Sequence, residues 1–600
     1  MPVYNAPAQD IRFVLHEVIN YEDLCGFDDY RDATGDVADA VVSELAKLCE
    51  ETLLPLNLSG DEEGCACSNK SVTTPKGFKE AYDLFVRNGW TGISADPEYG
   101  GQGLPNTLNF ILQEMISAAN MAFGMYPGLT QGAYDALHLH GNEEQKRIYL
   151  PKLASGIWSG TMNLTEPQCG TDLGLIKTKA VPNKDGSYNL TGQKIYISAG
   201  EHDLTENIIH LVLARLPDAP EGVRGISLFV VPKYFAEEKN GEIQKGKRNE
   251  GVFCQSIEKK MGIKASATCV MIYEDAKGWL VGEPHKGLRA MFTMMNAARL
   301  AVGMQGLGIA EVARQNAVAF ARERLQMRAL DGPKQPEKPA DPIIVHPDVR
   351  KNLLTMKAFT EGARALSYWT GVHLDISLKE KDRAKKQIAE DFVALMTPVI
   401  KAYLTDMGST CANLAVQVYG GHGYIHDYGV EQFVRDARIA QIYEGTNGIQ
   451  ALDLVGRKMS HSYGRMLRRF FHPVSDYITA EMENPEMQPY ILPLAKAFAK
   501  LQQSTAAIAM KGLKNPNEAG AASTDYLRQF ALVAMGYMWA RMCRAAILNR
   551  ENNPDNKSFY DTKLKTARFF FDKMLPETDC LFKSIMAGAD SVMALDEDQF

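Results

Sequence analysis

Four stretches of the sequence combine hydroxyl, glycine and charged residues: 163–172, 192–200, 260–268 and 417–450. The last contains Glu444, which lies between Tyr443 and Gly445 in an apolar stretch that ends a predicted helix. Burial of a carboxyl group raises its pKa from about 4.3 toward that of a useful general base. Taken alone, Glu444 would more simply cap a turn, so its interpretation as a base depends on the other three stretches.

Other patterns that could bind a phosphate or a metal are weaker. Gly303, Gly306 and Gly308 are spaced like a phosphate-binding motif, but no strand precedes them. We expect them to lie within a helix and to permit close helix packing. His422 and His426 are four residues apart, but the glycines around them predict a turn rather than a metal site. The sequence contains neither a P-loop nor an HExxH motif.

The length and composition exclude several classes of protein. A chain of 600 residues is long enough for roughly three to five domains. The 65 basic and 73 acidic residues give a net charge of −8, which argues against nucleic acid as a partner. Apolar runs stay below the length of about 18 residues that a membrane span requires, so we expect no membrane association.

The ten cysteines are sparse and irregularly spaced, and several, such as Cys254 and Cys411, lie in apolar patterns. This usage is typical of free thiols in a reducing compartment. Cys65 and Cys67 are too close together for a zinc site, so we predict no metal. The first 30 residues are acidic and have no apolar core, which predicts neither a secretory signal nor a transit peptide. We therefore expect a cytoplasmic protein.

Helical and strand patterns alternate along the chain. Helical periodicity covers about 36–155, strand-like runs such as 208–214 and 226–231 fill 160–283, and helical patterns resume after Gly287. The predicted fold is mainly α with an inserted β domain, an N-terminal lead and a C-terminal helical extension. The predicted domains are 1–35 (N-terminal lead), 36–159 (helical), 160–284 (β), 285–458 (four-helix) and 459–600 (helical extension).

Two stretches interrupt the later helices. A loop rich in Pro and Lys covers 331–342, and a basic stretch covers 456–474. The basic stretch also contains apolar residues and could bind an anionic membrane surface. We favour a solvated linker there, because Pro473 should limit the length of any helix.

The order and spacing of the four stretches resemble the acyl-CoA dehydrogenase family over residues 36–458. The N-terminal lead and the C-terminal extension resemble a long bacterial subfamily, which includes 3-methylmercaptopropionyl-CoA dehydrogenase. The resemblance implies an FAD enzyme that desaturates an acyl-CoA thioester: a base takes the α-proton while the β-hydrogen leaves as hydride to flavin N5. The substrate is left open between 3-methylmercaptopropionyl-CoA and a fatty acyl-CoA.

Within this resemblance Glu444 is the catalytic base, and its backbone N–H would help to hold the thioester oxygen. The family's other position for the base precedes the arginine that matches Arg299. Here that residue is Ala298, which cannot accept a proton. Arg299 would either orient the Glu444 loop by ion pairing or be only a charge on a helix surface. The predicted substrate contacts are Thr171, Asn296, Arg299, Glu444 and Gly445.

The resemblance also implies contacts with FAD. Thr165 and Ser198 match hydroxyl positions at the edge of the isoalloxazine ring. Arg324 and Gln326 match an arm that reaches the neighbouring subunit's FAD, and the glycine turn after Gln417 approaches the same cofactor. The predicted FAD contacts are Leu164, Thr165, Thr171, Tyr196, Ser198, Arg324, Gln326, Gln417, Gly420, Gly421 and Thr446.

The acyl length is weakly encoded. Gly124 and Gly128 match positions at the end of the family's substrate tunnel, where small residues would leave room for a bulkier acyl group. Alternatively, Pro127 and Gly128 simply break a helix.

The resemblance implies an electron-transferring flavoprotein as the redox partner. Two alternatives remain: an acyl-CoA oxidase on the same fold, or a non-catalytic helical scaffold. We expect a homodimer with two FAD, because apolar stripes in the extension must bury against the face that the family's tetramers use. One such stripe comprises Tyr526, Phe530, Val533 and Tyr537.

Overall fold

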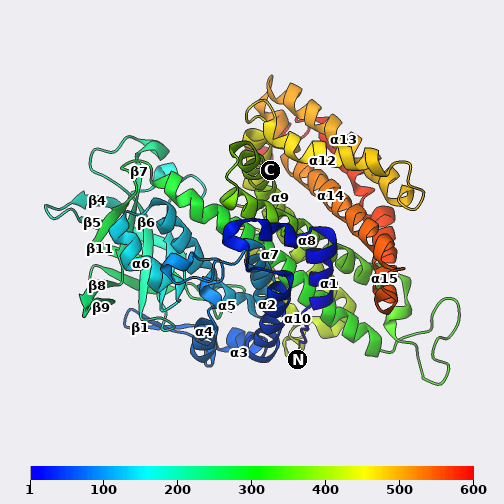
Figure 1. Ribbon diagram of the computed structural model, residues 1–600, viewed down its shortest axis with the longest axis horizontal. Helices are drawn as coiled ribbons and strands as arrows, with labels where there is room; N and C mark the ends of the chain where they lie inside the picture. The colour runs from blue at the N-terminus through cyan, green and yellow to red at the C-terminus, as the bar shows by residue number, and fades with distance from the viewer. Residues whose placement is uncertain (1) are drawn as a thin grey trace. The chain divides into compact units, whose positions relative to one another are not determined.

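The computed structural model describes residues 2–600 and forms two compact units (Figure 1). We name the first the helical unit: Met1–Ser43, Pro105–Glu114 and Val302–Phe600. The second, which we name the sheet unit, comprises Glu44–Leu104 and Met115–Ala301. Helices α2 (Gly35–Lys47), α5 (Asn106–His140) and α7 (Gly287–Glu323) have residues in both. The predicted domain boundaries stay predictions.

A seven-stranded sheet forms the centre of the sheet unit, in the order β10-β11-β5-β4-β6-β3, with β7 paired to β11 and β6. The apolar runs at 208–214 and 226–231 are indeed strands, and their residues are buried along almost their whole length, as their continuous hydrophobicity predicts. Two hairpins, β1–β2 and β8–β9, complete the unit. The strands are β1 (Ala66–Ser68), β2 (Ser71–Thr73), β3 (Trp158–Asn163), β4 (Lys179–Pro182), β5 (Tyr188–Ser198), β6 (Asn207–Arg215), β7 (Ile226–Pro232), β8 (Tyr234–Lys239), β9 (Glu242–Arg248), β10 (Val252–Ile257) and β11 (Thr268–Val281).

Helices α3 (Pro55–Glu63), α4 (Phe78–Arg87) and α6 (Glu143–Ala154) belong to the same unit. The long helix α5 is interrupted at Asn120, whose φ is −159° and whose Oδ1 accepts the N–H of Phe123 at 3.0 Å. The helix then continues through Pro127 and Gly128. The interpretation of these two residues as a helix break is therefore wrong, because the break lies earlier, where an asparagine side chain caps the second segment.

The helical unit contains α7, α8 (Pro347–Lys379), α9 (Arg383–Tyr419), α10 (Val430–Ala440) and α11 (Asn447–Asp453). The glycines at 303 and 306 do lie within α7, and they permit the predicted close packing. A Cβ at Gly306 would lie 2.4 Å from the carbonyl oxygen of Leu404 on α9, and one at Gly303 would lie 2.5 Å from Ile400 Cγ2. At these two positions α7 therefore lies too close to α9 for any side chain larger than that of glycine.

The C-terminal extension consists of α12 (Arg465–Glu481), α13 (Gln488–Gly512), α14 (Pro516–Asn549), α15 (Lys557–Phe569) and α16 (Glu577–Ala587). The linker predicted for 456–474 is wrong. Helix α12 passes through Pro473, its apolar residues Leu467, Phe470 and Val474 are buried, and Arg465 and Arg469 pair with Asp391 of α9. Packing of this apolar face outweighed the local cost of the proline.

Helix α14 is long and apolar enough to cross a membrane by length and composition alone. Its most apolar window is 83% buried within the protein, which is the pattern of a core helix. The predicted stripe of Tyr526, Phe530, Val533 and Tyr537 is buried along this helix.

The N-terminal lead is also helical and buried, although its polar composition gave no such signal. Helix α1 (Ala8–Arg12) continues as a π-helical turn at Phe13–Val18, and Ile11, Val14 and Leu15 are fully buried. The lead contacts the extension through polar groups: Arg541 donates to the carbonyl of Val18 at 2.5 Å. Tyr560 and Asn549 donate to the carboxylate of Glu17 at 3.0 and 2.7 Å.

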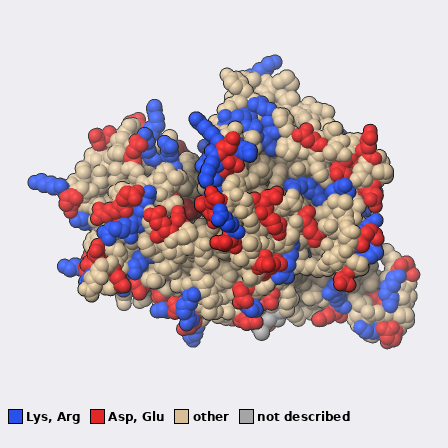
Figure 2. Space-filling view, in the orientation of Figure 1, with Lys and Arg blue, Asp and Glu red and all other residues tan. Residues whose placement is uncertain are grey.

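A buried ionic cluster joins the segments of the helical unit. The guanidinium of Arg364, on α8, contacts Asp10 of the lead, Glu114 of α5 at 2.6 Å and Glu311 of α7 at 3.4 Å. Lys563, on α15, contacts the same Asp10 and also Glu361 of α8 at 2.8 Å. Figure 2 shows that the visible surface carries interspersed charges of both signs, whereas these groups are buried.

We expect Arg364→Met to lower the free energy of unfolding of the helical unit by about 3–5 kcal/mol, because three buried carboxylates lose their guanidinium partner. Urea unfolding followed by tryptophan fluorescence, to which Trp369 and Trp539 of this unit contribute, measures this change. Lys381→Met is the matched control: its salt bridge with Asp28 is at the surface, where the lysine is 86% exposed, and its loss should cost less than about 0.5 kcal/mol. Equal effects of the two substitutions would contradict the role of the cluster.

Candidate active site

A buried ion pair organises the first two predicted stretches in the sheet unit. Lys194, fully buried on β5, donates to Glu166 Oε1 at 2.8 Å and to the carbonyl of Leu164 at 3.0 Å. The Glu166 carboxylate also accepts the backbone N–H groups of Lys177 and Thr178. Burial alone would raise the pKa of Glu166, but Lys194 and these hydrogen bonds lower it to about 2. The loop after β3 is therefore fixed to β5.

Four of the predicted flavin contacts lie together at this junction. Thr165 accepts the backbone N–H of Ile195 at 2.9 Å, so Leu164 and Thr165 lie beside the strand that carries Tyr196 and Ser198. The Thr165 and Ser198 side chains are partly exposed. Tyr196 is 62% exposed and has a φ of 59°. A bulky residue in the left-handed region is rare and concentrates at functional sites. Thr171 lies exposed further along the same loop.

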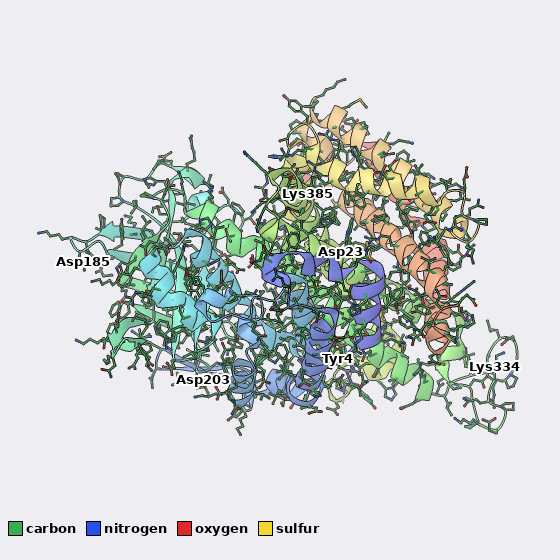
Figure 3. All side chains as sticks on the ribbon, viewed as in Figure 1. Tyr4, Asp23, Asp185, Asp203, Lys334 and Lys385 are labelled. Carbon is green, nitrogen blue, oxygen red and sulfur yellow. The ribbon has the colours of Figure 1, made fainter. Side chains whose placement is uncertain are left out.

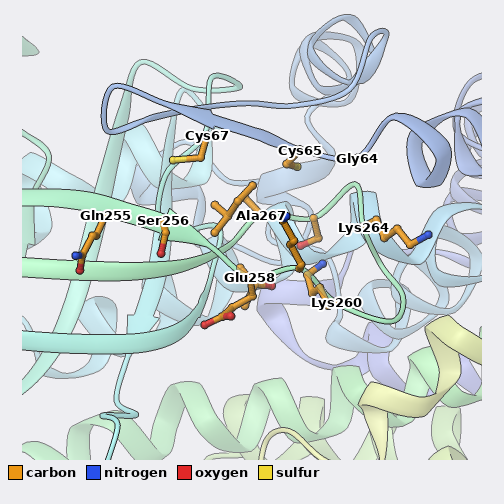
Figure 4. A pocket seen from close by; sticks show the side chains of 13 residues that line it. Gly64, Cys65, Cys67, Gln255, Ser256, Glu258, Lys260, Lys264 and Ala267 are labelled. Carbon is orange, nitrogen blue, oxygen red and sulfur yellow. The ribbon is translucent and has the colours of Figure 1, made fainter.

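The third stretch, 260–268, is attached to the second. Thr268 pairs with Ser198 across β11 and β5, and Ala267 accepts the backbone N–H of Ala199 at 2.9 Å. The Tyr126 hydroxyl of α5 accepts the N–H of Ala267 and donates to the carbonyl of Ala265, both at 3.0 Å. A hollow of about 600 Å³ lies beside this stretch. Cys65, Cys67, Glu258 and Lys260 are among the residues that line it (Figure 4).

Glu444 lies in a tight turn of the helical unit between α10 and α11. Its φ is 57° and that of Gly445 is 83°, so two successive residues are left-handed. The side chain of Gln450 donates to the carbonyl of Glu444 at 3.0 Å, and Lys401 of α9 donates to the carbonyl of Gly445 at 2.7 Å. Thr446 is the N-cap of α11 and accepts the N–H of Ile449 at 3.4 Å. Thr446 thus caps α11, and the alternative in which Glu444 caps a turn stays a prediction.

Arg299 and Asn296, two of the predicted substrate contacts, are neighbours on α7. Arg299 donates to Asn296 Oδ1 at 3.2 Å and is only 7% exposed. The alternative of a charge on the helix surface is therefore wrong. The predicted orientation of the Glu444 loop by Arg299 stays a prediction.

The predicted arm and the glycine turn lie next to each other in the helical unit. Phe320, near the end of α7, stacks on Tyr419, the last residue of α9, with ring centroids 4.1 Å apart. Arg324 and Gln326 follow Phe320 and are exposed, as are Gln417, Gly420 and Gly421 around the end of α9. A Cβ at either glycine would meet nothing within 4 Å, so the main chain there is open to a ligand or a partner.

Met327 and Arg328, which follow the predicted arm, lead into a long loop. The backbone of Gln326 donates to the carbonyl of Asp341 at 3.0 Å, so the arm is paired with the returning chain. The buried Asp341 carboxylate accepts the N–H groups of Ala329, Lys334 and Gln335. In Figure 3 the label of Lys334 marks this loop, which projects from the helices of its unit.

These features fit a flavin. The sheet unit presents two partly exposed hydroxyls and an exposed aromatic ring at one junction, and the helical unit presents a bare glycine turn beside an arginine. Hydroxyls and aromatic faces suit the polar edge and the flat face of an isoalloxazine, and an exposed arginine suits a pyrophosphate.

Family models match the chain along most of its length. The N-terminal, middle and C-terminal domain models of acyl-CoA dehydrogenases match residues 38–157, 161–276 and 285–459. A fourth, described as acetyl-CoA dehydrogenase C-terminal like, matches 470–596. The chain belongs to the acyl-CoA dehydrogenase family. It is accordingly an FAD-dependent oxidoreductase that acts on CH–CH bonds.

Among similar proteins, a 3-methylmercaptopropionyl-CoA dehydrogenase of Ruegeria pomeroyi is 43% identical over 98% of this chain and 99% of its own. A broad-specificity linear acyl-CoA dehydrogenase of Mycobacterium tuberculosis, FadE5, is 33% identical, with both chains fully covered. The structure of Caenorhabditis elegans ACDH-11 in complex with C11-CoA is 18% identical and has a TM-score of 0.79 over 99% of this chain and 95% of that one. This acyl-CoA dehydrogenase therefore shares its fold along its whole length, extension included.

Sequence reasoning missed three groups that hold the predicted site residues: Glu166, Lys194 and Lys401. Glu166 and Lys194 lie inside the first two stretches, so their charges were visible. The available signal was that each of these two stretches contains one charged residue at a position expected to be buried. Buried charges need partners of opposite sign, so Glu166 and Lys194 could have been paired. Lys401 lies outside all four stretches and gave no such signal.

We expect Glu166→Gln to weaken FAD retention and to lower the urea midpoint of the sheet unit, because Lys194 loses its buried partner. Because the pKa of Glu166 falls from 4.5 to about 2 on folding, the carboxylate stabilises the folded state at pH values above about 4.5. The difference between wild type and variant should therefore be largest above pH 5 and shrink as the pH falls toward 2. Urea midpoints and bound-flavin absorbance across this range measure it, and a difference that grows on acidification would contradict the ion pair.

Proposed function

We propose that this dehydrogenase oxidises a short acyl-CoA thioester with Glu444 as the base that takes the α-proton. The observation that carries the proposal is the turn at Glu444. Glu444 and Gly445 are both left-handed there, and side chains of α11 and α9 donate hydrogen bonds to their carbonyls. Strained backbone that neighbouring side chains hold in place is typical of active sites, where a side chain must keep one orientation.

The roles of the chain's own residues follow from this assignment. Glu444 removes the proton from the α-carbon, and its backbone N–H holds the thioester oxygen, where negative charge develops. Thr165 and Ser198 supply hydroxyls to the flavin edge, and Tyr196 covers part of the ring. FAD, when bound, supplies the two-electron acceptor for the oxidation of the Cα–Cβ bond.

We expect Glu444→Gln to keep its fold and its FAD but to lose turnover by about 10²–10⁴-fold, because the isosteric amide cannot accept a proton. Anaerobic bleaching of the flavin by an acyl-CoA substrate measures the loss directly. Glu390→Gln, an exposed carboxylate on α9, is the control and should leave the rate unchanged. Turnover of Glu444→Gln within a few-fold of wild type would refute Glu444 as the base.

For the substrate we propose 3-methylmercaptopropionyl-CoA or a linear acyl-CoA of similar length. The support is the identity to the Ruegeria pomeroyi and Mycobacterium tuberculosis relatives, whose names give these two substrate classes.

A matched pair of substrates separates the two classes. Pentanoyl-CoA has the same chain length as 3-methylmercaptopropionyl-CoA, with a methylene in place of sulfur. If the pocket selects the thioether, kcat/KM should favour 3-methylmercaptopropionyl-CoA by up to about tenfold, the effect of one favourable sulfur–aromatic contact. A preference for pentanoyl-CoA or for longer chains would refute the thioether while leaving the reaction class intact.

We further propose that electrons leave to an electron-transferring flavoprotein, as the family implies, rather than to oxygen. Peroxide released under air during turnover would identify an oxidase instead.

For the assembly we propose a homodimer in which the arm at Arg324 and the turn at Gly420 meet the partner. The support is that the apolar stripe of α14 is already buried within its own chain. A cytoplasmic location is supported by ten cysteines that are all free thiols.

A further inference from the structure

The turn that carries Glu444 is intrinsically unfavourable, and something must hold it. A residue with a Cβ seldom adopts a φ of 57°, and here a left-handed glycine follows it directly. The carbonyls of both residues point to side-chain donors rather than to the backbone of a regular element. The identity of these donors therefore decides where the Glu444 side chain is held.

Lys401 is the charged donor. It lies in the middle of α9, its side chain is fully buried, and its ammonium donates to the carbonyl of Gly445 at 2.7 Å and to Asn447 Oδ1 at 2.9 Å. A buried ammonium is tolerated only where oxygens replace its hydration shell. Both of these oxygens belong to the three residues that follow Glu444.

Asn447 closes the contact from the other side. Its amide donates to the carbonyl of Ala402 at 3.1 Å, to Thr405 Oγ1 at 2.9 Å and to Asp406 Oδ1 at 2.7 Å. Residues 401, 402, 405 and 406 lie on one face of α9. The turn is therefore clamped to one helical face by a lysine and an asparagine that also contact each other.

The face that holds the turn is itself fixed. Leu404, between these contact residues, lies against Gly306 of α7, where a Cβ would come within 2.4 Å of its carbonyl oxygen. Helices in such close backbone contact cannot slide or rotate without a clash. A displacement of α9 is thus prevented, and Lys401 transmits this rigidity to the turn.

We propose that Lys401 is a positioning residue for α-proton abstraction: its buried ammonium fixes the Glu444–Gly445 turn and so aims the carboxylate at the α-carbon. The inference rests on the proposed function, in which Glu444 is the base. A general base must lie within hydrogen-bonding reach of its proton, and a misplacement of about 1 Å can cost about 10²-fold in rate. Lys401 acts only through this geometry and touches no reacting atom.

The test compares Lys401→Met with Lys563→Met as purified holoenzymes. Lys563 is another buried lysine of the helical unit, paired with Asp10 and Glu361, and it belongs to no predicted site. Proton abstraction is measured separately from oxidation with 3,3-dimethylbutyryl-CoA, which has α-protons but no β-hydrogen. Its exchange of α-protons with D₂O, followed by mass spectrometry, requires the base alone.

For Lys401→Met we expect kcat and the exchange rate to fall together by about 10–100-fold, with KM changed less than threefold. Lys563→Met should lower the urea midpoint but leave both rates per bound flavin unchanged. Lys401→Arg, which keeps a buried cation and donors, should recover part of the exchange. Normal exchange in Lys401→Met, or an equal loss in Lys563→Met, would overturn the proposal.

A second variant covers the case in which Lys401→Met does not fold. Lys401→Gln retains one donor for the Gly445 carbonyl without the charge and should show the same joint loss of kcat and exchange. If neither variant folds with FAD bound, Lys401 is a stability residue and the proposal is overturned. Glu444→Gln distinguishes a failure of the base assignment from a failure of the Lys401 proposal. If Glu444→Gln retains exchange, Glu444 is not the base. If Glu444→Gln loses exchange while the Lys401 variants exchange normally, only the role of Lys401 is refuted.

Discussion

The contact between the Arg364 guanidinium and three buried carboxylates determines how the helical unit is assembled. The carboxylates come from the N-terminal lead, from α5 and from α7, and Lys563 of the extension joins the same group through Asp10. Such a cluster is weak evidence of stability, because its desolvation offsets much of its attraction. Its main effect is to disfavour incorrect arrangements of the helices, because an arrangement that separates one of these segments leaves a buried charge without its partner. The cluster thereby joins α7 and α8 to the lead, to α5 and to the extension.

One fully buried lysine in each unit holds predicted site residues, and the two do so in the same way. Lys194 donates to the carbonyl of Leu164 in the sheet unit, and Lys401 donates to the carbonyl of Gly445 in the helical unit. Each also contacts a side-chain oxygen of the segment that it holds, Glu166 Oε1 and Asn447 Oδ1. An ammonium has three donors on a flexible stem, so it can hold an irregular backbone that no ladder of peptide hydrogen bonds would fix.

Much of the fold and part of the site could be predicted from the sequence. The buried strands β6 and β7 follow from continuous apolar runs, and the close packing of α7 against another helix follows from Gly303 and Gly306. The segment of α12 and the N-terminal lead were harder, because their helices depend on burial against partners distant in the sequence rather than on local propensity. For the same reason α12 continues through Pro473, although the local effect of a proline predicts that the helix should end there. Lys401 could not be found, since the sequence does not show which lysine of a long helix faces inward, or which turn it meets.

The docking of the N-terminal lead on α15 also has a consequence for the order of events during synthesis. Asp10 leaves the ribosome first, but its partner Lys563 is made more than nine-tenths of the chain later. At about 5–20 residues per second, this interval lasts on the order of half a minute to two minutes. Throughout it, the ring of Phe13 lacks its contacts with Phe559 and Tyr560 of α15. The lead can therefore take its final position only after α15 has been synthesised.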